Sequence, residues 1–405
     1  MNRRVVLTGL GMRTPLGNSP SAFFAAAIAG QSGISRIKKF DASSYAVQIG
    51  GEIQENEPPT PSKYSGVVRW AIDAARDAIV DACLSLGAEN PNDVGVILGG
   101  GSPDLGVIEK YVNERRIKGP TYGSIQSAVD MNPAAAAVHI SAHFGLRGEV
   151  ANISTACSSS LNAIGYALRL IQNGNASCLL TGGVDEGLNA FYLSAFGNSS
   201  VLSKRNDDPE HASRPFDAGR DGYILSDAAC ILVLEDYEHA ARRGAPIYCE
   251  IAGFGASSDA CSPLKVDKSE VSSARAVEKA LASGEIAPHD VDYYCAHGSS
   301  SRWTDIRETR MLRRVFREDA TRLNISSIKS MMGHPLGAAG AVQAATCALA
   351  IRHGAIPPTI NYEKSDPDCD LNYVPNCARS QRVRHALCYS LGNGGNNAAL
   401  ALSAC

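Results

Sequence analysis

The sequence lacks an apolar run long enough to cross a membrane. The longest candidate, residues 341–351, is interrupted by Gln343 and Thr346, whereas a membrane-spanning helix needs about 18 to 20 consecutive apolar residues. Net charge is also small, at −3 over 405 residues with an isoelectric point near 6.3, so bulk positive charge does not favour binding to nucleic acid. These features predict a soluble protein with neither a membrane span nor a nucleic-acid partner.

Regular cysteine spacing is missing as well. The twelve cysteines show no repeated pattern, so we expect reduced thiols and a cytoplasmic location rather than a disulfide framework. A strand-like run begins at Arg3, which predicts no cleaved leader. Cysteines in apolar or strand-like contexts are expected to be small core residues: Cys83, Cys178, Cys230, Cys249, Cys347 and Cys388.

Strand-like and helical runs alternate along the chain, as in an α/β protein. The strand-like runs are residues 94–99, 177–182 and 228–235, and the runs with helical spacing are 70–86 and 274–283. A polar, basic stretch at 237–246 separates two halves of the sequence. Each half carries a strand–helix element of its own, so we predict an internal pseudo-repeat.

Cys157 follows a short β-prone run that ends in small residues, and a helical pattern starts directly after it. Apolar residues from Leu161 to Ile171 recur at three- and four-residue spacing, as on one face of a helix that ends near Gly174. The thiol is therefore predicted to lie on a tight strand-to-helix turn with open access. The positive end of the helix is expected to favour the thiolate. This pattern is typical of a nucleophile.

Two histidines follow short strand-like runs in the second half. His297 comes after residues 293–295 and precedes a Gly/Ser loop, and His334 precedes a Gly/Ala-rich helix. A single loop histidine more often stabilises a turn than performs chemistry. Together with Cys157, however, three strand ends each present a reactive side chain to a loop, as α/β folds do when they build a site.

Five further motifs occur in a defined order around these residues, at 4–17, 213–223 (Ser-Arg-Pro-Phe-Asp-Ala-Gly-Arg-Asp-Gly-Tyr), 357–362, 366–376 and 392–398. With them the chain resembles, over nearly its whole length, the elongating β-ketoacyl-[acyl-carrier-protein] synthases of types I and II in the thiolase superfamily. The resemblance implies an α/β, five-layer αβαβα thiolase fold made of two pseudo-duplicated halves. Residues 1–248 would carry the nucleophile and residues 249–405 the two histidines, usually in a dimer with its active sites near the interface.

The resemblance assigns a role to each candidate. Cys157 matches the acyl-accepting nucleophile, and His297 and His334 match the two active-site histidines. Lys329 matches the active-site lysine, and Glu308 matches the acidic residue that pairs near that lysine.

The implied reaction is a decarboxylative Claisen condensation. The cysteine takes an acyl chain from a pantetheine thioester, malonyl-acyl-carrier-protein loses carbon dioxide, and neutral imidazoles stabilise the enolate. Attack on the acyl-enzyme gives a 3-oxoacyl product extended by two carbons, and the oxyanion is held by the backbone N–H groups of Cys157 and Asn393. The resemblance implies no metal and no redox cofactor, because substrates ride on the phosphopantetheine of an acyl-carrier-protein.

Departures from the family pattern concern the pocket. The family usually has Phe at both apolar positions of its Ser-Phe-Gly-Phe-Gly-Gly turn, and the second Phe is a gate over the acyl pocket. Here Leu391 and Asn393 stand at these positions, which predicts either a wider pocket or drift that is compensated nearby. Ser299 and Ser301 keep hydroxyl groups for pantetheine, and the family's loop near the pantetheine channel is shortened at residues 259–263.

Basic residues are expected to meet an acidic carrier protein. Arg205 matches a docking arginine of the family. Weaker candidates, which could equally be ordinary solvated charges, are Lys63, Arg115, Arg116 and Lys118.

Two alternatives stay open beside the condensing enzyme. One is an acyltransferase on the same fold, and the other is a non-condensing partner subunit of the chain-length-factor type, although such subunits typically lack the cysteine. The sequence also leaves open a homodimer or a heterodimer with a related subunit. It does not separate fatty acid synthesis from a specialised polyketide, polyene or unusual-lipid pathway, and Asn393 favours the specialised side.

Overall fold

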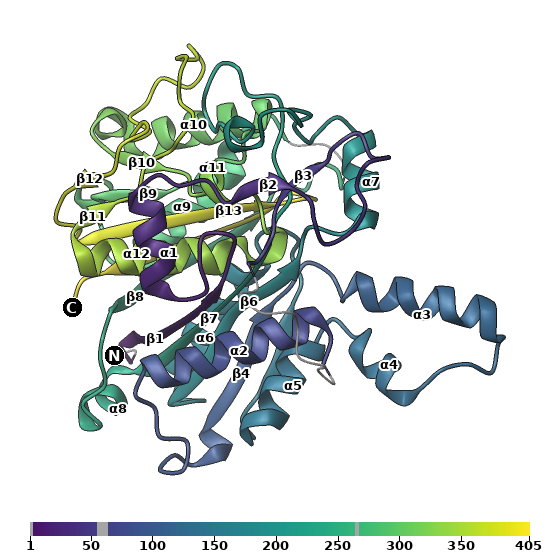
Figure 1. The fold of residues 1–405 in the computed structure, drawn as a ribbon. Helices are drawn as coiled ribbons and strands as arrows, with labels where there is room; N and C mark the ends of the chain where they lie inside the picture. Colours follow the sequence, from purple (N-terminus) through teal and green to yellow (C-terminus); the bar gives the residue numbers. More distant parts are fainter. Residues whose placement is uncertain (1–2, 55–63, 264–266) are drawn as a thin grey trace.

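A computed structural model of the chain describes residues 3–54, 64–263 and 267–405. Within these residues one sheet of ten strands runs through the molecule (Figure 1). Its strands are β1 (Val5–Arg13), β4 (Val94–Gly99), β5 (Val150–Ile153), β6 (Cys178–Glu186), β7 (Asp227–Asp236), β8 (Cys249–Ser258), β9 (Tyr293–Cys295), β10 (Asn324–Ser326), β13 (His385–Gly392) and β14 (Asn396–Ser403). Two small ribbons pair β2 (Ile34–Arg36) with β3 (Ile49–Gly51), and β11 (Ala355–Ile356) with β12 (Arg379–Ser380).

The α-helices in the described part of the chain alternate with these strands. They are α1 (Pro20–Ile28), α2 (Gly66–Asp81), α3 (Leu105–Lys118), α4 (Ile125–Asp130), α5 (Ala135–Phe144), α6 (Ser159–Gln172), α7 (Ala190–Asn198), α8 (Tyr237–Arg242), α9 (Val271–Ser283), α10 (Arg302–Phe316), α11 (Lys329–Met332) and α12 (Ala339–His353). No helix within the described ranges is both long and apolar enough to span a bilayer.

The sheet consists of two five-stranded halves with the same strand order and directions. The first half runs β5-β4-β6-β7-β1 and the second runs β10-β9-β13-β14-β8. In each half the first two pairings are parallel and the last two are antiparallel. The halves join where β1 pairs with β8, with Leu7 opposite Cys249. The predicted pseudo-duplication is confirmed, while the division at residue 248 stays a prediction.

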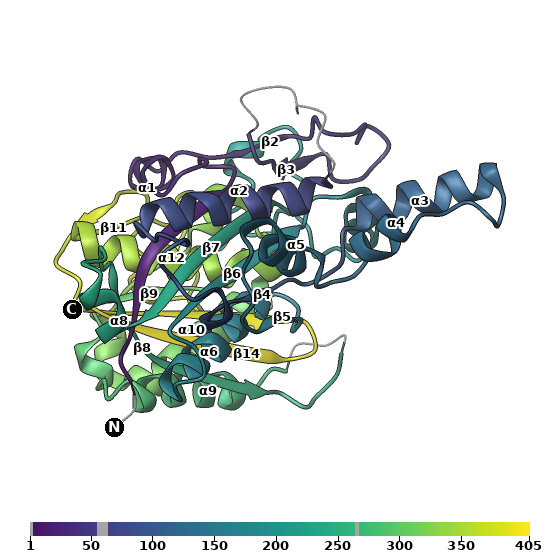
Figure 2. The same ribbon diagram turned by 90° about the horizontal axis from the view of Figure 1, so that it is seen from below.

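Helices lie on both sides of each half and between them, which makes five layers (Figures 1 and 2). Helices α2 and α5 pack on the outer face of the first half, α9 and α10 on that of the second, and α6 and α12 lie in the middle. The central helices can fit there because they carry small residues: a Cβ on Gly165 of α6 would come within 2.4 Å of the Phe254 ring on β8. The predicted αβαβα thiolase fold is confirmed.

Three expectations from the sequence need correction. The helix predicted over 70–86 begins at Gly66 and ends at Asp81, because Cys83 turns the chain with a φ of 49° while Leu84 still packs into the core. Cys83 itself is exposed rather than a core residue. The polar stretch at 237–246 contains helix α8, whose start is capped by the Asp236 carboxylate.

Helices α3 and α4 extend away from the layered body as an arm (Figures 1 and 2). The arm carries exposed apolar side chains, including Ile117 and Ile125. The last turn of α3 also carries three basic residues, Arg115, Arg116 and Lys118.

Candidate active site

One cavity of about 500 Å³ collects the predicted reactive side chains of both halves. It lies at the carboxyl ends of parallel strands, where α/β sheets usually bind ligands: β5 leads to Cys157, β9 to His297 and β10 to His334. Its lining residues are Cys157, Phe196, Ser199, Val201, Tyr223, Asp259, Pro263, His297, Ser299, Ser301, Thr304, Arg307, His334, Leu391, Gly392, Asn393, Gly394 and Gly395.

Cys157 lies on the predicted tight turn between β5 and α6. The preceding residue, Ala156, has a φ of 53°, a left-handed conformation that L-residues rarely adopt and that often marks functional sites. Two serines hold the turn, since Thr155 N–H donates to Ser159 Oγ at 2.9 Å and Ser158 Oγ donates to Thr155 O at 2.8 Å. The elbow geometry predicted from the sequence is confirmed.

The expected thiolate, in contrast, is wrong for the free protein. Cys157 is only 7% exposed, and burial raises the pKa of its thiol to about 11. The charge of Lys329 lowers this pKa, as do the backbone N–H groups of Asn393 and of Cys157 itself, but together they do not offset the loss of solvation. The nucleophile is therefore a neutral thiol at pH 7 before substrate binds.

His297 is held through its backbone and its ring. Its N–H donates to Glu308 Oε1 at 2.8 Å, and its carbonyl accepts from Lys329 Nζ at 2.6 Å. Its ring Nδ1 accepts from the backbone N–H of Leu391 at 3.3 Å, so the ring proton is on Nε2. Burial, together with the charge of Lys329, lowers the pKa of His297 well below its usual value. His297 is thus a neutral imidazole whose Nε2–H is the ring's hydrogen-bond donor.

His334 lies beside it, with ring centroids 5.3 Å apart and ring planes at 89°. Its backbone is tied to the strand-like segment after Tyr223, because His334 N–H donates to Ile224 O at 2.7 Å and Ser226 N–H donates to His334 O at 3.2 Å. Burial and the charge of Lys329 lower its pKa well below the usual value. Within the described residues its Nδ1 has no hydrogen-bond partner. The site therefore offers a second neutral imidazole.

Lys329 and Glu308 lie behind the histidines and do not line the cavity. Glu308 accepts from Tyr294 Oη as well as from the N–H groups of His297 and Gly298, at 2.7 to 2.8 Å. Burial raises the pKa of Glu308 to about 7 and lowers that of Lys329. The charge of Glu308 raises the pKa of Lys329 and so partly offsets its burial, and both side chains bind the backbone of His297 directly.

The residues of the predicted oxyanion hole and gate lie next to the thiol. The backbone N–H of Asn393 is directed at the Cys157 sulfur, which it helps to stabilise as an anion. Leu391 is buried in the cavity wall, whereas the Asn393 side chain is exposed at its edge. Whether Asn393 widens the acyl pocket stays a prediction.

Ser299 and Ser301 also line the cavity, and Ser299 Oγ is within 3.1 Å of Thr304 Oγ1. Sequence reasoning missed the ion pair beside them. Arg307 binds Asp259 through both terminal nitrogens at 2.7 and 2.8 Å, and the two side chains are only 4% and 3% exposed. The one signal in the sequence was a charged residue, Arg307, among the buried positions of α10. Its partner Asp259, however, lies 48 residues away along the chain.

The carrier-docking candidates do not form one patch on this cavity. Arg205 is 36% exposed, donates to Gly219 O at 2.9 Å and lies 3.7 Å from Asp221. Arg115 and Arg116 are exposed on the arm, and Lys63 lies outside the described residues. A docking role for any of them stays a prediction.

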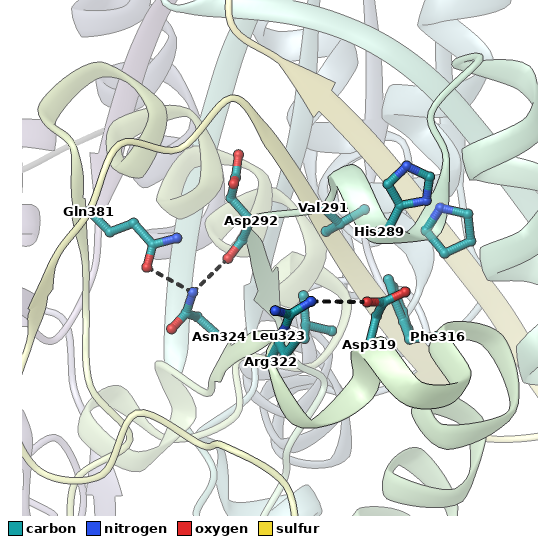
Figure 3. Close-up of a pocket in the computed structure, with 10 residues that line it drawn as sticks. His289, Val291, Asp292, Phe316, Asp319, Arg322, Leu323, Asn324 and Gln381 are labelled. Atoms are coloured by element: carbon teal, nitrogen blue, oxygen red, sulfur yellow. Dashed lines mark hydrogen bonds and ion pairs between the residues drawn. The ribbon is translucent and has the colours of Figure 1, made fainter.

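A separate groove of about 220 Å³ lies at the opposite, amino ends of β9, β10 and β13 (Figure 3). Asn324 spans it, donating to Asp292 O at 2.9 Å and Gln381 Oε1 at 3.0 Å. The groove contains neither Cys157 nor the two predicted histidines, so it is not the predicted reactive site. In the described part of the chain, no three His, Cys, Asp or Glu side chains gather as a metal ion would require.

Two family models together match most of the chain. The family model "Beta-ketoacyl synthase, N-terminal domain" matches residues 2–240, and "Beta-ketoacyl synthase, C-terminal domain" matches residues 248–363. The chain is 40% identical over 410 residues to "3-oxoacyl-[acyl-carrier-protein] synthase 2" of Coxiella burnetii (strain RSA 493 / Nine Mile phase I), covering 99% of this chain and 98% of that protein.

Two solved structures superimpose over the full length of both chains, each with a TM-score of 0.93 and 31% identity. One is described as "type II PKS acyl-carrier protein in complex with its ketosynthase bound to the hexaketide" (AntDE:AntF). The other is "The ishigamide ketosynthase/chain length factor".

Proposed function

The chain belongs to the beta-ketoacyl synthase family, and we propose that Cys157, His297 and His334 carry out its decarboxylative condensation. The observation that carries this assignment is the single cavity that brings one thiol and two neutral imidazoles together. The product would be a 3-oxoacyl-acyl-carrier-protein that is two carbons longer than the acyl chain loaded on Cys157.

In the first step the acyl group moves from the carrier to Cys157. The sulfur attacks the thioester carbon, the bond to the pantetheine sulfur breaks, and the thiol proton leaves with the free carrier thiol. The N–H groups of Cys157 and Asn393 would hold the oxyanion that forms in between, and one such donor is typically worth about 3 kcal/mol. The same two groups lower the pKa of the thiol in the free protein, which supports their orientation.

In the second step malonyl-acyl-carrier-protein replaces the free carrier. Its carbon–carboxylate bond breaks to release carbon dioxide, and the electron pair forms an enolate whose oxygen accepts hydrogen bonds from the imidazoles. The enolate carbon then attacks the acyl carbon, and the sulfur of Cys157 leaves as a thiolate as the new carbon–carbon bond forms. The thiolate takes up one proton from solvent, which regenerates the neutral thiol. His297, with its proton on Nε2, has the donor that this step needs.

Intact-protein mass spectrometry on a panel of acyl-acyl-carrier-proteins tests the proposal. We expect an acyl adduct on Cys157 that malonyl-acyl-carrier-protein discharges as a chain two carbons longer, and no thioester adduct in Cys157→Ser. An adduct that malonyl does not discharge would instead establish an acyltransferase. Absence of any adduct, with normal folding, would indicate a non-condensing subunit or the need for a partner.

The partners and setting follow from the same resemblance. We propose that the substrates are carried on phosphopantetheine, with Arg205 contributing to carrier docking, and that residues 1–248 and 249–405 form the two halves.

The assembly is a dimer, either of two copies or with a related subunit, as in the ketosynthase/chain length factor structure. Native mass spectrometry of the purified chain, alone and with co-expressed relatives, separates these two cases. The free state of all twelve cysteines is consistent with a cytoplasmic enzyme.

A further inference from the structure

We propose that Asp185 is a positioning residue for His334, acting through the loop of residues 334–338. This inference rests on the proposed role of His334 and concerns a buried carboxylate that does not itself line the cavity. Asp185 lies near the end of β6 in the first half, whereas the loop belongs to the second half. Its carboxylate therefore connects the two halves directly beneath the site.

The Asp185 carboxylate accepts three hydrogen bonds from the segments on either side. Its Oδ2 accepts from the backbone N–H of Gly337 at 2.9 Å and from that of Gly101 at 2.9 Å. Its Oδ1 accepts from Ser102 Oγ at 3.2 Å. Hydrogen bonds to a charged acceptor are about twice as strong as neutral ones, so Asp185 anchors Gly337 firmly to the loop that follows β4.

The loop is fixed at both of its ends. At the first end His334 N–H donates to Ile224 O at 2.7 Å, and at the other Gly337 N–H donates to Asp185. Between them Leu336 has a φ of 41°, a strained left-handed conformation that persists only where the surroundings impose it. Without the anchor at Gly337 we expect Leu336 to relax and His334 to shift with it.

Close packing at Gly337 leaves little room for another arrangement. A Cβ added there would lie 2.3 Å from Gly101 N and 2.8 Å from Asp185 Oδ2. The next element, α12, begins at Ala339, and the N–H of Ala341 donates to Ser160 Oγ on α6 at 2.9 Å. The Asp185 carboxylate accepts from Gly337, two residues before α12 begins, and the positive end of a helix favours an anion nearby.

The charge of Asp185 allows a second measurement, because it affects the pKa of the Cys157 thiol. This carboxylate raises the pKa of the Cys157 thiol, whereas Lys329 lowers it. Burial raises the pKa of Asp185 itself to about 6, so it is mostly ionised at pH 7. Replacing Asp185 by a neutral side chain should therefore lower the pKa of Cys157, an effect that a purely structural role elsewhere would not produce.

The test compares Asp185→Asn, Asp185→Ala and the control Glu186→Gln. Glu186 is the next residue on β6 but binds Lys39 at 3.0 Å instead of the 334–338 loop. Three rates are measured on the full-length protein: loading from acyl-carrier-protein, decarboxylation of malonyl-carrier-protein, and alkylation of Cys157 by iodoacetamide against pH.

We expect Asp185→Ala to load within a few-fold of the unmodified protein and to decarboxylate malonyl roughly 10- to 100-fold more slowly, since small misplacements of catalytic groups cost about that much. Asp185→Asn, whose amide oxygen can still accept from Gly337, should keep most decarboxylation. Both variants should shift the alkylation profile to lower pH, and Glu186→Gln should match the unmodified protein in all three rates.

Normal decarboxylation by Asp185→Ala, or an equal loss of loading and decarboxylation, would overturn the positioning role. An unchanged alkylation profile in both Asp185 variants would show that the carboxylate does not act on this site. Alkylation of Cys157 needs no substrate. It therefore still tests the effect of Asp185 on this site if the unmodified protein neither loads an acyl chain nor decarboxylates malonyl-carrier-protein. Failure of the unmodified protein in both reactions would contradict the proposed function and not the role of Asp185.

Discussion

The ammonium group of Lys329 donates to the backbone carbonyl of His297, with Nζ and O 2.6 Å apart. On the other side of the same residue the His297 N–H donates to Glu308. A buried cation and a buried carboxylate therefore hold the backbone of the histidine between them, and neither lines the cavity. Glu308 therefore affects the chemistry through the position of His297, whereas the charge of Lys329 also lowers the pKa of both imidazoles and of the thiol.

The thiol of the free protein should react slowly at neutral pH. Because burial raises the pKa of Cys157 to about 11, the thiolate fraction and the rate of alkylation by iodoacetamide should increase about tenfold per pH unit above pH 7. Lys329→Met removes a charge that lowers this pKa, so the variant should react more slowly at every such pH. Mass spectrometry of the alkylated peptide measures both rates. A plateau near pH 8 would contradict a buried neutral thiol.

His334→Ala should separate the two half-reactions. The variant retains Cys157 and the oxyanion-hole N–H groups, so loading of the acyl chain should remain within a few-fold. Malonyl decarboxylation should decrease by about 100-fold or more, because general acid–base groups typically contribute 10²–10⁴-fold. The release of carbon dioxide from labelled malonyl-carrier-protein measures the second rate. Condensation at the normal rate in this variant would exclude the assigned role.

Asn393→Phe should narrow the range of acyl chains that load on Cys157. Asn393 lines the cavity next to Gly394 and Gly395 and is exposed, so a larger aromatic ring there should cover part of the cavity. The backbone N–H is retained, so loading of the shortest chains should persist. Competition among acyl-carrier-proteins that carry chains of different length, read by mass spectrometry, gives the profile. Asn393→Ala, which removes the asparagine side chain without adding bulk, serves as the control. An unchanged profile would show that residue 393 is not a gate here.

Arg307→Met should destabilise the protein by about 3 kcal/mol, since removal of one partner of a buried ion pair leaves the other charge uncompensated. Its partner Asp259 is 3% exposed and also accepts from Asn397 Nδ2 at 2.8 Å. Arg310→Met is the matched control on the same helix, because the pair of Arg310 and Asp368 is 52% and 56% exposed and should be worth under about 1 kcal/mol. Urea unfolding of the three proteins measures the difference. Equal stabilities would show that the buried pair contributes no more than the surface pair.

Much of the site could be predicted from local sequence. Small residues before Cys157 and the apolar spacing after it are enough to indicate a strand, a tight turn and a helix, because such turns depend on a few adjacent side chains. The same holds for α12, whose small residues fit a helix buried between two sheet halves. The alternation of strands and helices was sufficient to predict the α/β class.

Other properties depend on residues far apart in the chain. The pairing of Arg307 with Asp259 and the anchoring of Gly337 by Asp185 join segments 48 and 152 residues apart, and no local pattern relates them. The protonation state of Cys157 is the clearest case. Its position at the start of a helix favours a thiolate, yet burial by both halves keeps it a neutral thiol. Local patterning thus predicts which groups reach the strand ends, whereas solvation, which sums over all surrounding residues, sets their charge.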